Sequence, residues 1–198
     1  MTKKYYVRMM NRIIGLDPGS EESGMVVIDG SSIIAAFNLS NEQFYCKVTN
    51  YLLHPNTTIV IEDLAAYSLR LTPQVISAAK FIGECLYRLK IEAGANVVLI
   101  QRSKVKKWCF DTFPFVCNPI IEKKIEKKNQ RDKDGNFKKP HFFYIDDKSV
   151  TECMKYLYKI SLPLPGKGYD YGLQTHSWQA LAVASCFLHS GDSHQLTT

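Results

Sequence analysis

Two acidic residues and one histidine stand at the borders of apolar segments, where a fold could bring them together. Asp17 ends the run "RIIGLD" and Glu62 ends "TIVIE", while His176 lies at the start of "THSWQALAVA". Two neighbouring carboxylates repel each other unless a cation lies between them, and Mg²⁺ is a hard cation that prefers oxygen ligands. These residue types therefore favour a metal site.

Each of the three residues also has a simpler explanation. An aspartate before Pro-Gly is common in turns, Glu62 can be a surface acid at a strand end, and His176 can be a partly buried residue at a helix start. The metal site requires that the elements carrying these residues end at one edge of the fold. The glycines beside Asp17 would then let a polymer backbone approach closely.

The hydrophobic pattern predicts an α/β fold, with a mixed five-stranded sheet flanked by helices on both faces. Three short apolar runs, with Asp29-Gly30 as a tight turn, predict an antiparallel meander at the start. Strands then alternate with helices, as in parallel sheets with crossover connections. The expected strands are residues 12–17, 24–30, 31–39, 57–63 and 95–101, and the expected helices are residues 41–53, 73–92, 103–113, 146–160 and 174–190.

Two helices carry more detailed expectations. Ser103 is the expected cap of the helix 103–113. The helix 73–92 begins with a proline at an early position, and an apolar stripe along it is formed by Val75, Ala79, Ile82, Leu86 and Leu89.

A basic stretch interrupts the pattern at residues 118–141, where eight Lys and Arg lie among four acids. We interpret it as an insertion or flexible loop in a single domain of residues 1–198. It is either a solvated linker or an arm that follows a phosphate backbone.

Composition narrows the class of protein. The chain has 198 residues with 25 Lys and Arg against 19 Asp and Glu, a formal charge of +6 that favours a polyanionic partner. Its six cysteines contain no C-x-x-C pair, which predicts reduced, structural thiols. No signal peptide or transmembrane segment is recognisable, so we expect a cytoplasmic or other reducing intracellular compartment.

The three motifs together resemble a known family. "GLDPGSEESG", then "IVIED" followed by a long helix, then "THSWQALAVA" are similar, in this order, to the signature of RuvC-type Holliday-junction resolvases. The resemblance covers most of the chain except residues 118–141. It implies an RNase H-like fold and a homodimeric, Mg²⁺-dependent endonuclease of DNA recombination and repair that resolves four-way junctions, with Mn²⁺ as a substitute ion.

Carried over by position, the resemblance assigns Asp17 and Glu62 as the first two catalytic, metal-binding acids and His176 as the third metal-binding residue. The family has an acid at a fourth position, where this sequence has Gln179. An amide oxygen can bind a metal but brings no negative charge. Asp170, six residues before His176, is a possible substitute carboxylate.

Other residues receive DNA-binding roles from the same resemblance. The segment after Glu62 would probe the junction centre through Tyr67 and Leu69, beside Arg70, where an apolar side chain can wedge against unstacked bases. Basic residues near the active site would contact phosphates or offset charge at the leaving group. These residues are Lys104, Lys106, Lys107 and Lys148.

Three functions remain open on the sequence. The first is metal-dependent cleavage of branched DNA, and the second is a junction-binding protein whose cleavage is impaired because Gln179 replaces the expected acid. The third is a kinase-type ATPase, since "GLDPGS" also resembles a phosphate-binding hairpin, but such folds need two lobes and the chain has no second Asp-x-Gly hairpin.

Overall fold

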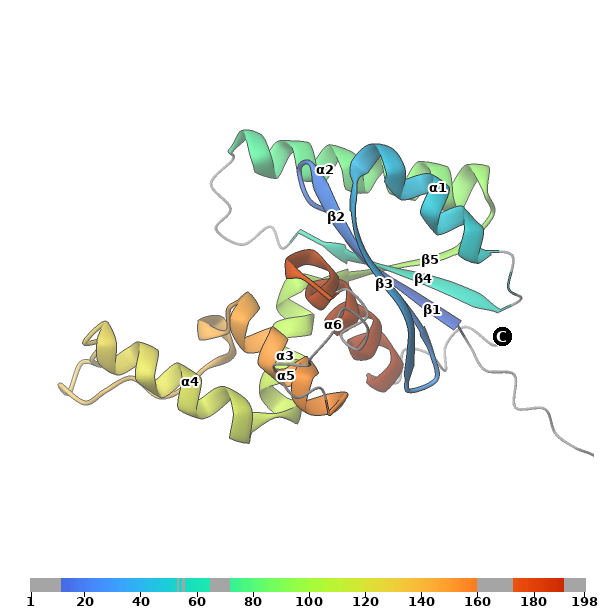
Figure 1. Ribbon diagram of the computed structural model, residues 1–198. Coiled ribbons are helices and arrows are strands. Elements are labelled where there is room, and N and C mark those ends of the chain that lie inside the picture. The colour runs from blue at the N-terminus through green and yellow to red at the C-terminus, as the bar shows by residue number, and fades with distance from the viewer. Residues whose placement is uncertain (1–11, 53, 55, 65–71, 160–172, 191–198) are drawn as a thin grey trace, which may run out of the picture.

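A five-stranded mixed sheet forms the centre of the computed structural model, which describes residues 12–52, 54, 56–64, 72–159 and 173–190. The strand order is β3-β2-β1-β4-β5, in which β1, β2 and β3 pair antiparallel and β4 and β5 join in parallel (Figure 1). The strands are β1 (Arg12–Asp17), β2 (Glu22–Asp29), β3 (Ser32–Ser40), β4 (Thr57–Asp63) and β5 (Asn96–Gln101). The expected meander, the parallel additions and all five strands are therefore confirmed, each within two residues of its expected bounds.

Helices cover both faces of this sheet, as the hydrophobic pattern predicted. One face is covered by α1 and α2, and the other by α3, α5 and α6, with α4 extending outward (Figure 1). The helices are α1 (Asn41–Leu52), α2 (Pro73–Leu86), the π-helix η1 (Tyr87–Glu92), α3 (Arg102–Thr112), α4 (Pro114–Lys127), the 3₁₀-helix η2 (Phe142–Tyr144), α5 (Asp147–Leu157) and α6 (Thr175–His189).

Alternation along the strands produces two separate cores. Because successive side chains of a strand point to opposite faces, Ile13 packs toward α6 and Ile14 toward α1 and α2. Helix α6 is buried on all sides from Trp178 to Phe187, because it lies between the sheet and helices α3 and α5.

Two glycines allow α6 to lie directly on the sheet. A methyl group at Gly15 would come within 2.2 Å of the Ala180 carbonyl oxygen, and one at Gly24 within 2.2 Å of the His176 backbone. At Gly19 it would meet the Glu22 carbonyl oxygen at 2.1 Å. The expected role of the glycines near Asp17, to admit an external polymer, is therefore wrong for these positions, since protein backbone fills the space.

The stripe expected on the helix 73–92 is only partly correct. Ala79 is exposed, and the residues that face the sheet are Ala78, Phe81, Ile82, Cys85 and Leu89. The helix continues to Glu92, but its last turns widen into the π-helix η1, in which the Ala93 N–H bonds to the Arg88 carbonyl. Ala79 precedes η1, and the neighbouring Ala78 is buried in its place, whereas Leu89, the stripe residue within η1, is buried as expected.

The expectation of a loop at residues 118–141 is wrong for its first ten residues. Residues 118–127 belong to α4, which buries Ile121 and Ile125 against the main core. Beyond α4, Arg131 and Phe137 form an isolated antiparallel bridge around a turn at Gly135. The apolar residues of α4 are separated by many charged residues, so the sequence shows no clear helical pattern there.

Smaller expectations have mixed outcomes. Helix α3 starts at Arg102 with Gln101 at its N-cap, so the assignment of Ser103 as the cap is wrong.

All six cysteines are free, as predicted, and five of them are buried. Among the described residues, no helix is both long and apolar enough to cross a membrane.

The close approach of α6 at Gly24 predicts the effect of a single methyl group. We expect Gly24→Ala to lower the free energy of unfolding by about 1–3 kcal/mol, because backbone must move to relieve the overlap. The control is Gly83→Ala in α2, where a methyl group meets nothing within 4 Å and helix propensity should add up to about 1 kcal/mol. Urea denaturation of both variants checks this, and equal effects would contradict the packing argument.

The N-cap of α5 predicts an acid-dependent loss of stability. Burial opposes ionisation of Asp146, but Lys124 and the Ser149 backbone N–H outweigh it and lower the pKa of Asp146 to about 2. Its stabilising effect is therefore complete above its unfolded pKa and disappears as the pH falls from about 4 to about 2. Asp146→Ala should cost about 1 kcal/mol at neutral pH and little below pH 2.

Asp146→Asn is the matched control for this effect, because asparagine caps a helix without carrying a charge. Its cost should be smaller and should reflect the ion pair with Lys124 alone. A difference between wild type and Asp146→Ala that stays constant down to pH 2 would show that the carboxylate is not involved.

Candidate functional site

The two predicted acids lie side by side at one edge of the sheet. Strands β1 and β4 are parallel neighbours with Leu16 opposite Ile61, so Asp17 and Glu62 follow at the same level at their carboxyl ends. Each residue is only 6% exposed. The structure thus brings together the two carboxylates that the sequence pattern proposed as a pair.

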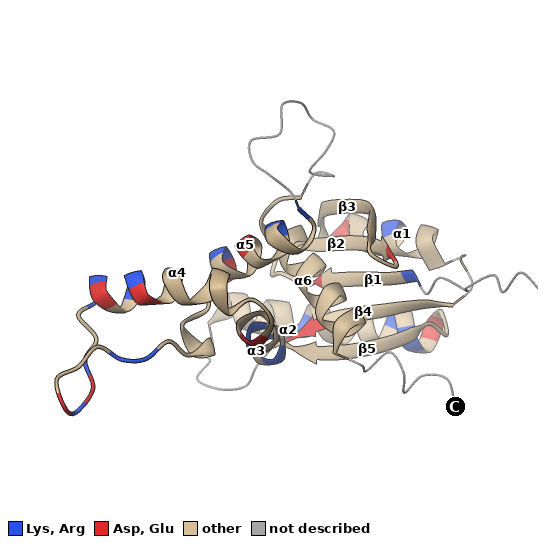
Figure 2. Ribbon diagram, turned by 90° about the horizontal axis from the view of Figure 1, so that it is seen from below, with Lys and Arg blue, Asp and Glu red and all other residues tan. Residues whose placement is uncertain are grey.

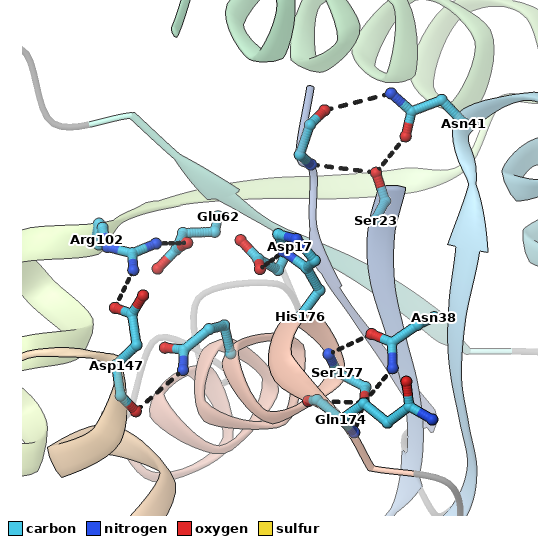
Figure 3. A network of polar contacts seen from close by, with 12 residues as sticks. Asp17, Ser23, Asn38, Asn41, Glu62, Arg102, Asp147, Gln174, His176 and Ser177 are labelled. Carbon is cyan, nitrogen blue, oxygen red and sulfur yellow. Dashed lines mark hydrogen bonds and ion pairs between the residues drawn. The ribbon is translucent and has the colours of Figure 1, made fainter. Parts of the chain in front are cut away.

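Helix α6 adds His176 to this pair. Its Nδ1 lies 2.8 Å from Oδ2 of Asp17 (Figure 3). The first turn of α6 is fixed by β3, because the Asn38 amide oxygen accepts a hydrogen bond from the Ser177 backbone N–H at 3.0 Å. Asp17 is also directly opposite Gly24, the residue on which the His176 backbone rests, so the same close packing positions the imidazole.

Arg102 joins the site from the next strand, and the sequence analysis missed it. Its Nη1 lies 2.7 Å from Oε2 of Glu62, and its Nη2 forms an ion pair with Asp147 at the start of α5 (Figure 3). Arg102 directly follows β5, which is the parallel neighbour of β4. Arg102 follows the end of an apolar strand, just as Asp17 and Glu62 stand at the ends of theirs, and this position was the available signal in the sequence.

The charges of the site are mutually dependent. Burial and the neighbouring Asp17 raise the pKa of Glu62 well above its usual value, although Arg102 acts in the opposite direction. The hydrogen bond with Asp17 raises the pKa of His176. Burial disfavours the charge of Arg102, but the attraction of Glu62 and Asp147 outweighs it and raises the pKa of Arg102. The site is therefore an acidic pair in contact with one guanidinium and one imidazole.

Gln179 lies near this network in the second turn of α6 and is 5% exposed. Its amide nitrogen donates a hydrogen bond to the backbone carbonyl of Asp147 at 3.3 Å. Gln179 thus joins α6 to the start of α5. Asp170, the substitute carboxylate suggested by the sequence, lies outside the described residues.

The expected DNA-contacting residues fall into two groups. Lys106 is half-buried, and burial together with the nearby Arg102 lowers its pKa. Lys104, Lys107 and Lys148 are exposed, and Lys107 pairs with Asp111 on its own helix. The proposed junction-probing residues Tyr67, Leu69 and Arg70 lie outside the described residues.

The donor set has a chemistry that fits a divalent cation only in part. Two buried carboxylates side by side, of which Asp17 raises the pKa of Glu62, suit a hard cation. Within the described part of the chain, however, no group of three His, Cys, Asp or Glu side chains is arranged to hold a metal ion. Asp17 and Glu62 are the residues that fit.

Comparison with known proteins supports the fold. No family model matches the chain, and no curated protein matches it in sequence. Among solved structures, Thermus thermophilus RuvC in complex with a Holliday junction substrate matches with a TM-score of 0.56 at 13% identity, covering 94% of this chain and 96% of that one. A second Thermus thermophilus RuvC structure matches with a TM-score of 0.55 at 15% identity, covering 93% and 96%.

The chain therefore has the RNase H-like fold of RuvC, as the three motifs implied. Because the sequence identity is so low, the similarity establishes the fold and leaves the activity to be argued from the site itself.

The bridge formed by Arg102 predicts unequal effects of removing its partners. Arg102→Met leaves the buried Glu62 without its cation, and because the Arg102 side chain is 30% exposed we expect a decrease of about 2 kcal/mol in the free energy of unfolding. Asp147→Asn should cost less than about 1 kcal/mol, since the Asp147 side chain is 53% exposed.

Glu62→Gln on the Arg102→Met background should recover part of this stability, because it removes the unpaired charge. Thermal and urea unfolding of the single and double variants provide the measurement. Independent, additive effects of Arg102→Met and Glu62→Gln would contradict the direct pairing.

Proposed function

We propose that this protein is a structure-selective DNA endonuclease that resolves four-way junctions by metal-dependent hydrolysis of phosphodiester bonds. The observation that carries the proposal is the buried pair Asp17 and Glu62, at the carboxyl edge of a sheet with the fold of RuvC. Burying two carboxylates side by side costs free energy, and titratable groups with a perturbed pKa in such a position are typical of functional sites.

Asp17 and Glu62 would hold the cation. The resemblance to RuvC adds His176 and the Gln179 amide oxygen as further ligands, although in this structure His176 contacts Asp17 and Gln179 bonds to the backbone of Asp147. A bound Mg²⁺ or Mn²⁺ supplies a Lewis acid that stabilises negative charge on phosphate oxygens. The hydrogen bond through Nδ1 orients the His176 ring and leaves Nε2 as its other donor or acceptor. Lys106, whose lowered pKa reflects burial beside Arg102, is placed to offset charge on the DNA backbone.

A homodimer is part of the proposal. Helix α2 and η1 carry large apolar side chains that are exposed in the single chain, namely Ile76, Tyr87 and Ile91, which are 42%, 57% and 66% exposed. Pairing of two chains through this face would cover them, and a two-fold enzyme suits the two-fold symmetry of a four-way junction.

A second candidate is a protein that binds junctions without cutting them. Two features favour it: the uncharged Gln179, and Arg102, which already neutralises Glu62 at 2.7 Å. In this second candidate, the guanidinium of Arg102 occupies the position beside Glu62 that a metal ion would otherwise take.

Nicking of a labelled four-way junction, with a linear duplex of matched sequence as the control substrate, distinguishes the two. For the endonuclease we expect Mg²⁺-dependent paired nicks in the junction alone. Asp17→Asn should reduce nicking by about 10³-fold or more while junction binding changes little, because it removes a group needed for charge stabilisation in the transition state.

Gln179→Asp provides the complementary test. Tight binding without cutting in the wild type, with cutting gained by Gln179→Asp, would identify a site that lacks only one charge. Absence of junction preference in both forms would refute both candidate functions.

A further inference from the structure

The segment between α3 and α5 projects from the edge of the sheet that carries the site. Helix α4 and the hairpin that follows it extend away from the body in both Figure 1 and Figure 2, with many of its charged residues along its length. We refer to α4 from residue 118 and the chain up to residue 141 as the basic arm.

Much of the protein's net charge lies on this arm. Residues 118–141 contain eight Lys and Arg and four Asp and Glu, so they contribute +4 of the chain's formal +6 within 24 of its 198 residues. Six of the lysines form no ion pair with any residue that the structure describes, and all six are exposed: Lys123, Lys127, Lys128, Lys133, Lys138 and Lys139. These charges are therefore available to a partner.

The arm that carries these charges is folded at both its base and its tip. At its base, Ile121 and Ile125 are buried in the main core. At its tip, Oδ1 of Asp132 accepts hydrogen bonds from the backbone N–H groups of Asp134 and Asn136, at 3.0 and 2.9 Å. The Arg131 guanidinium lies over the Phe137 ring at 4.4 Å. Since Asp132 and Arg131 are used within the turn, the lysines carry the surface charge.

The base of the arm is connected to the site. Lys124 pairs with Asp146 at 2.7 Å, and the next residue, Asp147, pairs with Arg102, which contacts Glu62. The part of α4 that belongs to the arm, residues 118–127, corresponds to about 15 Å of helix, a length that spans about four phosphates along one DNA strand at 3.4 Å each. A duplex that enters the site can therefore lie along the arm.

We propose that the basic arm binds the phosphate backbone of a duplex arm of the DNA whose strand is held at Asp17 and Glu62. The composition favours nucleic acid over a protein partner, because the centres of protein interfaces are depleted in lysine while phosphate contacts are made largely by Lys and Arg. The inference rests on the proposed function for the identity of the DNA, and it assigns a contact surface outside the fold's catalytic edge.

The test is the salt dependence of junction binding by the full chain. The variant Lys127→Gln, Lys128→Gln, Lys138→Gln, Lys139→Gln removes four exposed charges without changing a buried residue. Fluorescence anisotropy with a catalytically silent Ca²⁺ buffer, between about 50 and 200 mM salt, gives the slope of log affinity against log salt. We expect the slope to fall by about 0.9 for each phosphate that the variant no longer neutralises, and affinity to fall about tenfold or more.

The matched control changes charge in the opposite direction on the same arm. Glu122→Gln, Glu126→Gln removes two exposed acids from α4 and should tighten binding. Unchanged melting temperatures would show that both variants keep the fold.

A four-lysine variant with the affinity and salt slope of the wild type would overturn the arm as a DNA surface, as would weaker binding in both sets of variants. Absence of junction binding by the wild type itself would instead refute the proposed function.

Discussion

The packing of α6 on β1 and β2 without intervening side chains is the constraint on which the site depends. Gly15 and Gly24 leave no room for a methyl group beneath the helix, so the backbone of His176 rests on the strand residue that faces Asp17. Asn38 holds the Ser177 N–H from β3. Any shift of this helix would separate the histidine and Gln179 from the carboxylates, because all of them are carried by rigid elements.

The buried acids make this arrangement electrostatically costly, and the chain offsets the cost with polar partners of its own. Arg102 contacts Glu62, His176 contacts Asp17, and Asp147 balances the second side of the guanidinium. Retaining two carboxylates at a strand edge, at the expense of stability, is typical of a functional site. Arg102 also connects the buried acids to the base of the basic arm, through the adjacent residues Asp146 and Asp147.

Much of the fold could be predicted because its signals are local. The strand 57–63 was identified from β-branched residues, and Asp17 and Glu62 from their places at strand ends. Helix α4 was not recognised, because Ile121 and Ile125 are surrounded by lysines and glutamates and a charge run is usually solvated. On the helix 73–92 the stripe was misplaced by one position at Ala79, since the adjacent Ala78 is the buried residue and the two alanines cannot be distinguished by type.

The sequence by itself determined which polar residues stand at the ends of elements, the two acids and the histidine, because side-chain type and strand ends can be read from neighbours along the chain. Only the tertiary structure decided which partners meet them. The contacts of Arg102 with Glu62 and Asp147 join segments about 40 residues apart in the chain, and the hydrogen bond between His176 and Asp17 spans 159 positions. Such pairs have no local signature, since they depend on how helices and strands pack rather than on the residues beside them.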